Sequence, residues 1–418
     1  MRSSALRERA RLYSDILRHA TRTGDLKRLP SAPAMLTCGD DDRGYEVAGR
    51  KYAQILDSLN ERLMENALAT VTIPLPYSAL HGAKAFGRVL PVHGEFARAE
   101  ILHRLQMLGR RSSPRGSPRI DAWRRILLAV RPRVVIGIQP PPELCIAARG
   151  LRIPVTDLQH GLLSDEGYYG MAFRERFGQD GWPDFILCWD APSAAWAASR
   201  LPATVRAKII GNPWLLRFQR DADAQAALDG VPVPLPPDRG RPKLLVTLQW
   251  GFEGRPGYHD SSMPLALAEA IRRGPEYDWW IRLHPMQLTA GIRTRLYASL
   301  ERDFGSAGYV FWAECSAAPL QLVLRHVDLH LTSHSAVAIE ASCLGIRTAL
   351  LDQRHALLRE WLGAYIDSGS AELVPDSPGA ISTWIRTSLR AERPSAVSFM
   401  NMDGLNSFIA SLRDSGKP

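Results

Sequence analysis

The feature that most constrains the fold of this chain is a strand–helix–strand pattern between residues 133 and 158. Residues 133–138 (RVVIGI) are a short run of branched apolar side chains, residues 143–149 have a helical pattern, and residues 153–158 (IPVTDL) are a second apolar run. Two strands joined by a helix lie parallel in one sheet, because only antiparallel strands are joined by a tight hairpin. The sequence therefore predicts an α/β fold built on parallel strands.

The same alternation is found again after a proline-rich stretch. Residues 231–242 (VPVPLPPDRGRP) are typical of a stiff, extended linker, and strand and helix patterns alternate again from residue 243 to 351. A chain of 418 residues also exceeds the length at which one core usually stops growing. We predict two Rossmann-like, doubly wound domains facing a cleft: an N-terminal domain over residues 1–230, the linker over 231–242, and a C-terminal domain over 243–418.

Composition excludes several classes of protein. Hydrophobic residues make up 45% and charged residues 23% of the chain, as in globular proteins. No stretch has the roughly 18 uninterrupted apolar residues of a membrane span, and no signal peptide is recognisable, so we expect a cytoplasmic protein. The five cysteines and the acids at residues 40–42 lack the spaced partners of a metal site. We expect reduced thiols, a solvated turn at residues 40–42 and no metal.

The formal net charge of +9 predicts an acidic partner. Part of the excess lies in residues 2–28, where apolar side chains recur at helical spacing, and part lies in residues 104–125. The opening helix has two alternative uses, docking on the body of the protein or lying on a membrane surface. We expect no nucleic-acid partner and a peripheral contact with anionic lipid at the inner face of the cytoplasmic membrane.

A glycine- and acid-rich loop, residues 159–170, follows the second strand of the strand–helix–strand unit. Ligands bind at the carboxyl ends of parallel strands, which is where this loop lies. The candidate catalytic residues, which exchange protons near neutral pH, are Asp157, His160, Asp165 and Glu166. As acceptor-activating base we rank Asp165 first, Asp157 second and His160 third. The alternative is a polar surface loop in which His160 caps a helix.

The C-terminal domain has short polar motifs at the ends of its predicted strands. An arginine forms forked contacts with phosphate, and an imidazole donates to phosphate or protonates a leaving group. Hydroxyls at the start of a helix bind anions, and an acid within that helix would hold a ribose hydroxyl. The candidate donor-binding residues are Gln249, Gly251, Arg282, His284, Pro285, Thr332, Ser333, Ser335 and Glu340. The alternatives are an arginine paired with a surface acid and simple helix capping.

Three of these motifs together resemble the GT-B glycosyltransferases of bacterial surface-polysaccharide biosynthesis. The motifs are DLQHG at 157–161, RLHP at 282–285 and TSHSAVAIEA at 332–341. They are most similar to enzymes that use CMP-activated acidic sugars, of the sialyltransferase and Kdo-transferase-like kind, with CDP-glycerol polymer transferases as cousins. The resemblance covers residues 131–352, and the order and spacing of the motifs carry it.

This resemblance implies roles for individual residues. His284 with Pro285, and Ser333 with Ser335, would contact the donor phosphate. Asp165, in the acid-acid-glycine sequence DEG at 165–167, is similar to the acid that serves as base in bacterial sialyltransferases. The resemblance also implies a nucleotide-sugar donor, CMP-linked, with no other cofactor.

The leading hypothesis is therefore a metal-independent glycosyltransferase. It would move a sugar from a nucleotide donor to a surface-polysaccharide or lipid-linked glycan acceptor. One alternative is glycerol- or ribitol-phosphate transfer from a CDP-linked donor, with His160 as base. The other is a non-catalytic nucleotide- or glycan-binding protein.

Overall fold

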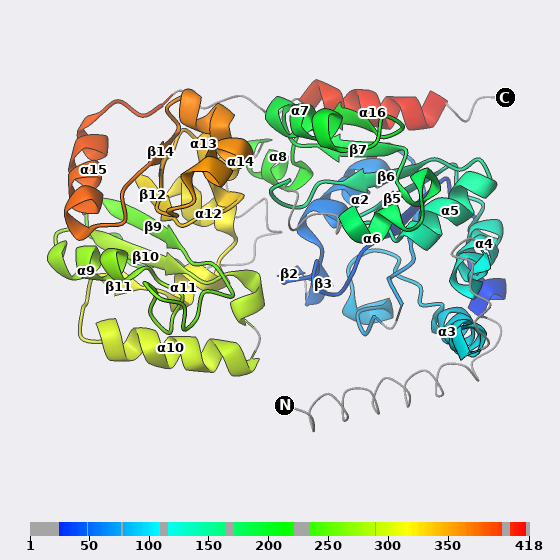
Figure 1. The fold of residues 1–418 in the computed structure, drawn as a ribbon, viewed down its shortest axis with the longest axis horizontal. Helices are drawn as coiled ribbons and strands as arrows, with labels where there is room; N and C mark the ends of the chain where they lie inside the picture. Colours follow the sequence, from blue (N-terminus) through cyan, green and yellow to red (C-terminus); the bar gives the residue numbers. More distant parts are fainter. Residues whose placement is uncertain are drawn as a thin grey trace. The chain divides into compact units, whose positions relative to one another are not determined.

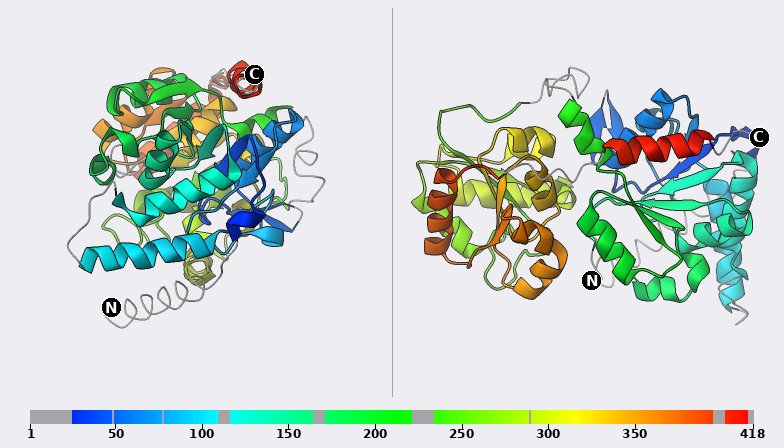
Figure 2. Two further views of the ribbon diagram at one scale, coloured as in Figure 1. Left: turned by 90° about the vertical axis from the view of Figure 1, so that its right-hand side faces the viewer. Right: turned by 90° about the horizontal axis from the view of Figure 1, so that it is seen from above.

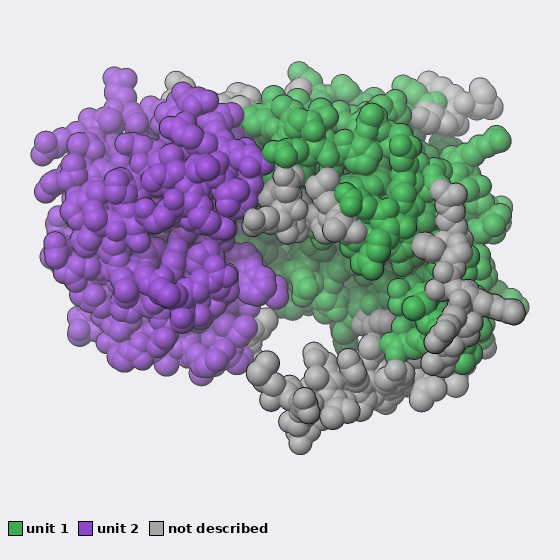
Figure 3. All heavy atoms as spheres, viewed as in Figure 1, with its two compact units in different colours: residues 1–216, 400–418 green, residues 217–399 purple. Residues whose placement is uncertain are grey.

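The computed structural model describes residues 25–47, 49–76, 78–108, 116–163, 171–220, 234–288, 290–394 and 402–414. Helices and strands alternate around two parallel sheets (Figure 1, Figure 2). The chain divides into unit 1, Met1–Leu216 with Met400–Pro418, and unit 2, Arg217–Phe399, coloured separately in Figure 3. The predicted α/β class with two Rossmann-like domains is confirmed.

Unit 1 is built on a six-stranded parallel sheet in the order β4-β1-β5-β6-β7-β8. Its strands are β1 (Ala34–Thr37), β4 (Thr70–Thr72), β5 (Val134–Gly137), β6 (Val155–Leu158), β7 (Phe185–Cys188) and β8 (Arg206–Ile209). Its helices are η1 (Asp25–Arg28), α2 (Gln54–Glu65), η2 (Gly82–Lys84), α3 (His93–Leu108), α4 (Pro118–Val130), α5 (Pro142–Gly150), α6 (Met171–Glu175), η4 (Gln179–Gly181), α7 (Ala191–Arg200) and α16 (Met402–Asp414). Helix α8 (Pro213–Arg220) begins in unit 1 and ends in unit 2.

Both faces of this sheet are covered, because successive side chains of a strand point to opposite faces. In β1, Met35 packs in one core cluster with side chains of α3, α4 and α5. Its neighbour Leu36 packs in another with side chains of α2 and α16. The continuous apolar runs read from the sequence are thus strands buried on both sides.

One predicted helix is replaced by a hairpin. The sequence pattern predicted a helix over residues 45–66, whereas β2 (Tyr45–Val47) pairs antiparallel with β3 (Arg50–Tyr52) and the helix α2 begins only at Gln54. Gly49 lies in the connecting turn with φ of 71°, a left-handed conformation that glycine adopts without steric cost.

The last helix departs from the predicted domain boundaries. The sequence placed residues 243–418 in one C-terminal domain, but α16 belongs to unit 1, lying along it in both views (Figure 1, Figure 2). Leu405, Phe408 and Ile409 of α16 are buried in the core cluster of α2 and β1. Each such side chain stabilises the fold by about 1.5–3 kcal/mol when removed from water, which explains why the chain returns to its first unit.

Unit 2 has a second six-stranded parallel sheet, in the order β11-β10-β9-β12-β13-β14. Its strands are β9 (Lys243–Thr247), β10 (Asp278–Arg282), β11 (Val310–Phe311), β12 (Leu329–Thr332), β13 (Arg347–Leu350) and β14 (Ala371–Leu373). Its helices are α9 (Leu265–Arg273), η6 (Pro285–Leu288), α10 (Ala290–Phe304), α11 (Ala313–Ala317), α12 (Leu320–Arg325), α13 (Val337–Cys343), α14 (His355–Asp367) and α15 (Pro378–Arg390).

The described part of the predicted linker, residues 234–242, packs on unit 2. Leu235 packs against the core cluster of α12, and the guanidinium of Arg239 lies 5.1 Å from the ring centre of Phe311. Arg241 donates a hydrogen bond to the carbonyl of Pro275 at 3.0 Å. These contacts make this stretch an extended edge of unit 2 rather than a free spacer.

Candidate functional site

The polar motifs of unit 2 lie at one edge of its sheet. Strands β10, β9, β12 and β13 are neighbours and parallel, so the loops that follow them meet at their carboxyl ends. Gln249 and Gly251 follow β9, His284 and Pro285 follow β10, and Ser333 follows β12. The fold therefore brings the predicted donor-binding motifs to one edge, although they are far apart in the sequence.

Gln287, which sequence analysis did not select, joins the first two loops. Its buried side chain accepts a hydrogen bond from the His284 N–H at 2.9 Å and donates to the Gln249 carbonyl at 3.2 Å. It also donates to Glu253 at 2.9 Å, and Glu253 accepts from the Gly251 N–H at 2.8 Å. This network fixes the loops of Gln249 and His284 relative to each other. A lone glutamine in a short helix gives no sequence signal for such a role.

His284 is a neutral hydrogen-bond donor. Its Nδ1 accepts from the Met286 N–H at 3.2 Å, so the proton of the neutral ring is on Nε2. Burial lowers the pKa of the imidazole to about 4, although the charge of Glu253 acts in the opposite direction. A neutral ring with its proton on Nε2 suits hydrogen bonding to a phosphate oxygen better than protonation of a leaving group.

Arg282 is buried beneath these loops. Its Nη1 donates to the carbonyl oxygens of Cys315 and Ala318, where α11 ends. This guanidinium nitrogen therefore braces the backbone of unit 2. The forked contact of Arg282 with phosphate stays a prediction.

Glu340 is buried in α13, where its carboxylate accepts a hydrogen bond from Gln321. Burial raises the pKa of this carboxyl to about 7, while the Gln321 hydrogen bond and the charge of Arg282 lower it. The carboxyl therefore changes charge near neutral pH. Its contact with a ribose hydroxyl stays a prediction.

The three predicted hydroxyl groups have different surroundings. Thr332 donates to the Thr247 carbonyl at 3.1 Å and ties β12 to β9. Ser335 accepts from the Val337 N–H at 3.2 Å and so holds the turn that leads into α13, whose N-cap residue is Ala336. Ser333 is buried, with its Oγ 3.5 Å from the hydroxyl of Tyr258. Among the three, Ser333 is the hydroxyl with the longest and weakest described contact.

A histidine–carboxylate pair completes this edge. Nδ1 of His334 lies 2.9 Å from Oδ2 of Asp352, and Nη2 of Arg354 lies 2.8 Å from the same oxygen. His334 lies within a motif read from the sequence but was not selected as a site residue. Asp352 has one signal that would have found it, its position directly after a buried strand.

In unit 1, Asp157 lies within β6 and is fully buried. Its Oδ1 accepts a hydrogen bond from the Gln139 N–H at 2.9 Å, and Gln139 has a left-handed φ of 48°. The carboxylate thus holds the turn after β5. Gly137, beside Asp157 in the sheet, has no room for a side chain because a Cβ would lie 2.7 Å from Cγ2 of Thr37.

The next two residues have separate roles. The side chain of Gln159 is buried and links the end of β6 to the residues after β7. Its Oε1 accepts from the Trp189 N–H at 2.8 Å, and its Nε2 donates to Ser193 at 3.1 Å. Burial lowers the pKa of the His160 imidazole to about 4, so the ring is neutral at neutral pH. A neutral imidazole is in the form that accepts a proton. Asp165 and Glu166 lie outside the described residues.

The turn after β1 differs from the solvated turn predicted for residues 40–42. Asp42 is half-buried and accepts a hydrogen bond from the Gly39 N–H at 2.8 Å. Burial raises the pKa of Asp42 to about 6, opposed by that hydrogen bond and assisted by the charges of Asp41 and Asp157. Asp42 is thus a further acid at the carboxyl edge of this sheet.

The described residues contain no cluster of three or more histidine, cysteine, aspartate or glutamate side chains arranged to hold a metal ion. Across the same residues, no helix combines the length and apolar character that crossing a membrane requires. The side chains of the five cysteines are all buried.

No family model matches the sequence, and no curated protein matches it significantly. Solved structures do match. UDP-GlcNAc 2-epimerase from Neisseria meningitidis, bound to UDP-GlcNAc, is 14% identical with a TM-score of 0.57 over 91% of this chain and 99% of that one. The chain has the GT-B fold. The epimerase from Methanocaldococcus jannaschii, in complex with UDP-GlcNAc and UDP, is 14% identical with a TM-score of 0.56 over 91% and 99% of the two chains. The wall teichoic acid polymerase TagF is 10% identical with a TM-score of 0.57 over 100% of this chain and 97% of that one.

Proposed function

We propose that this GT-B chain is an enzyme acting on a nucleotide-activated substrate, with the nucleotide phosphate held by unit 2. The observation that carries the proposal is the placement of His284 and Ser333 after β10 and β12, the two strands that flank β9. His284 offers an Nε2–H donor, and Ser333 offers a hydroxyl whose described contact is long. The same fold occurs in the epimerase structures bound to UDP-GlcNAc and UDP.

The reaction proposed first is transfer of a sugar from a nucleotide donor, CMP-linked, to a surface-polysaccharide or lipid-linked glycan acceptor. Unit 1 would supply the base that takes the proton of the acceptor hydroxyl. Asp157 is fully buried and holds the turn at Gln139, which favours a positioning role for it. Asp165 and His160 are the remaining candidates for the base.

A second candidate is transfer of a polyol phosphate. The match of TagF over the whole of this chain favours it, and His160 lies at the carboxyl end of β6. In this reaction His160 would take the proton of the acceptor hydroxyl. The variants Asp165→Asn and His160→Asn distinguish the two bases, because the residue whose variant loses turnover while keeping nucleotide affinity is the base.

A nucleotide screen tests the common part of both candidates. The unfolding of the full chain is followed with CMP, CDP, UDP and GDP, and binding at a hundred times Kd adds about 2.7 kcal/mol to the free energy of unfolding. Stabilisation by cytidine nucleotides supports the CMP- and CDP-linked donors. Stabilisation by UDP, followed by conversion of UDP-GlcNAc without an acceptor, would instead support an epimerase reaction. No stabilisation by any of the four overturns the proposed function.

A further inference from the structure

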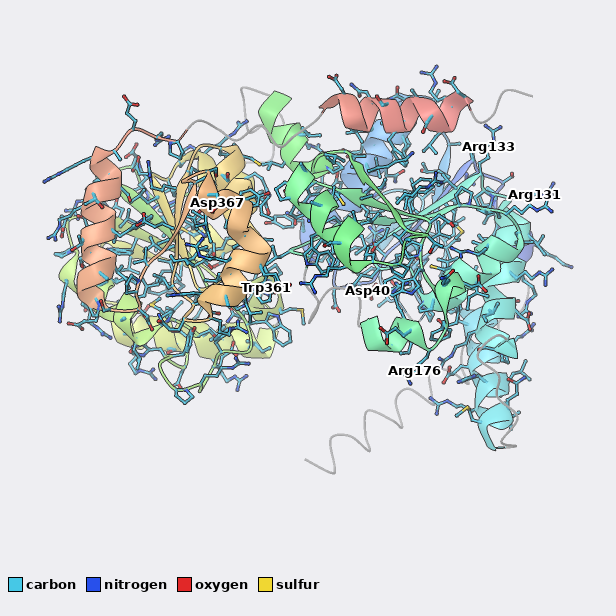
Figure 4. All side chains as sticks on the ribbon, turned by 45° about the horizontal axis from the view of Figure 1, so that its top comes forward. Asp40, Arg131, Arg133, Arg176, Trp361 and Asp367 are labelled. Carbon is cyan, nitrogen blue, oxygen red and sulfur yellow. The ribbon has the colours of Figure 1, made fainter. Side chains whose placement is uncertain are left out.

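The imidazole of His334 is held in one orientation. Nδ1 lies 2.9 Å from Oδ2 of Asp352, and the side chain is 20% exposed. The ring centre is 5.5 Å from that of Phe252 and 5.9 Å from that of Trp361 on α14, which is labelled in Figure 4. Aromatic rings and a carboxylate from three segments therefore position this side chain before any ligand arrives.

Asp352 is an ionised anchor. Its side chain is 6% exposed and accepts hydrogen bonds from the Arg354 N–H at 2.9 Å and from Arg354 Nη2 at 2.8 Å. Burial opposes ionisation, but the hydrogen bonds from His334 and Arg354 hold the pKa of Asp352 well below its usual range. Oδ2 of Asp352 thus contacts two side chains, the imidazole of His334 and the guanidinium of Arg354.

This anchor determines which ring nitrogen is offered to a ligand. Since Nδ1 donates to Asp352, Nε2 points away from the carboxylate, on the other side of the ring. Nε2 has no hydrogen-bond partner among the residues that the structure describes. Strand β9 lies between β10 and β12 in the sheet. His334 lies in the loop after β12, and His284 lies in the loop after β10.

The charges facing His334 nearly cancel. Asp352 and Arg354 come from the loop after β13, and Arg354 Nη2 is 3.5 Å from Nδ1 of His334. From the loop after β9, Tyr258 is neutral and Arg255 lies over the ring of Phe252 at 4.5 Å. The carboxylate of Asp352 and the guanidinium of Arg354 therefore offset each other in charge beside the imidazole of His334.

We propose that His334, positioned by Asp352, is a further phosphate-contacting residue of unit 2, with Nε2–H donating to a phosphate oxygen of the nucleotide. This inference deepens the proposed function and rests on it for the identity of the ligand. His284 donates as a neutral ring. His334 would donate from both ring nitrogens as an imidazolium, with Nδ1–H on the carboxylate of Asp352 and Nε2–H on the phosphate.

The test is isothermal titration of the full chain with CMP, UDP and inorganic pyrophosphate. We expect His334→Asn to weaken binding by about 10- to 100-fold, the effect of losing one hydrogen bond to a charged group. The matched control is His326→Asn, because His326 follows α12 and precedes β12, at the opposite end of that strand.

A second measurement separates contact from mere support of the fold. In ¹⁵N spectra of the imidazoles, assigned with His334→Asn, the Nε2 signal of His334 should move on addition of the nucleotide that binds. Asp352→Asn should keep the imidazole of His334 but reduce the affinity for the nucleotide. If Asp352→Asn does not fold, the His334→Asn titration and the spectra decide.

The outcomes distinguish this inference from the proposed function. Nucleotide binding that is unchanged in His334→Asn overturns the role of His334 and leaves the proposed function standing. Pyrophosphate binding that requires His334, without binding of any nucleotide, keeps the phosphate contact and overturns the proposed function. Binding of no probe by the unmodified chain overturns both.

Discussion

His284 and Arg282 are two residues apart at the end of β10, yet their side chains have different surroundings. Arg282 is buried and bonded to the carbonyls of Cys315 and Ala318. His284 is only partly buried and has a donor on Nε2. The position of each side chain, not its charge, therefore separates the brace from the candidate ligand contact.

For His284 we expect a loss of ligand recognition without a loss of stability. In His284→Ala one preorganised donor is removed, which typically costs about 2–4 kcal/mol of transition-state stabilisation. The measurement is kcat/KM with the donor found by the nucleotide screen, beside the free energy of unfolding. His326→Ala is the control, and normal turnover by His284→Ala would remove this residue from the site.

For Arg282 we expect a loss of stability. Arg282→Ala leaves the carbonyls of Cys315 and Ala318 without their buried donor, and each unsatisfied group costs about 1–3 kcal/mol. Urea unfolding at pH 7 measures the effect, and Arg295→Ala, at an exposed arginine of α10, is the control. Equal stability of Arg282→Ala and the unmodified chain contradicts the brace.

At the scale of the element, strand β12 buries a histidine in the middle of the sheet. His330 is fully buried, with Nε2 2.9 Å from the Thr247 hydroxyl on β9 and Nδ1 3.1 Å from the Thr348 hydroxyl on β13. Burial lowers the pKa of His330 to about 3. The unfolded chain takes up this proton near pH 6.5. Neutral His330 therefore contributes stability that is present above pH 6.5 and is lost as the pH falls toward 3.

We predict that His330→Gln reduces the acid sensitivity of the fold. Between pH 7 and pH 5.5 the unmodified chain should lose about 1 kcal/mol more unfolding free energy than the variant, from this one group. Urea unfolding at both pH values gives the comparison, and His284 and His160 titrate equally in both proteins. Parallel pH profiles would show that His330 is not the group that titrates.

Helix α16 packs closely on unit 1 through a glycine. A Cβ built on Gly404 would overlap the carbonyl oxygen of Ile209, at the end of β8. Gly404→Ala must therefore shift the helix, and overpacking of this kind costs about 1–3 kcal/mol. We expect lower stability in urea and faster proteolysis at the start of α16. The control Gly379→Ala, in α15, has nothing within 4 Å of the new methyl group and should leave stability near that of the unmodified chain.

At the scale of the whole molecule, several arginines are paired with acids where the sequence suggested a basic surface. Arg104 and Arg119 pair with Glu100, and Arg125 pairs with Glu95. The other basic segment, residues 2–28, lies almost wholly outside the described residues. Contact with anionic membrane stays a prediction, as does a place at the inner face of the cytoplasmic membrane.

The exposed end of α3 makes that prediction testable. Leu102, Leu105 and Met107 are 51%, 59% and 54% exposed, an apolar surface next to the arginines. We expect the chain to float with vesicles that contain anionic lipid, since each cation near such a surface adds about 1 kcal/mol, and to float less when Leu102 and Leu105 are changed to serine. Neutral vesicles are the control. Flotation that does not depend on anionic lipid, on salt or on the two serine substitutions would refute contact with anionic membrane.

The sequence alone determined the α/β class, the parallel strands and the two Rossmann-like domains. Each of these follows from short-range patterns: apolar runs of strand length, helical spacing between them, and their repetition along the chain. The strand–helix–strand unit at residues 133–158 appears in the structure as β5, α5 and β6. The candidate donor-binding residues were likewise selected from their positions after predicted strands, and their roles stay predictions.

Only the tertiary structure decided what depends on contacts between distant residues. Helix α16 packs on unit 1, because its apolar side chains are buried against those of α2 and β1. These elements lie far earlier in the chain, so no local pattern predicts the contact. The tertiary structure also buried Arg282, made Gln287 the link between two loops and paired His334 with Asp352. Local patterns predict the type of an element, whereas the burial and partner of a polar side chain depend on which strands become neighbours.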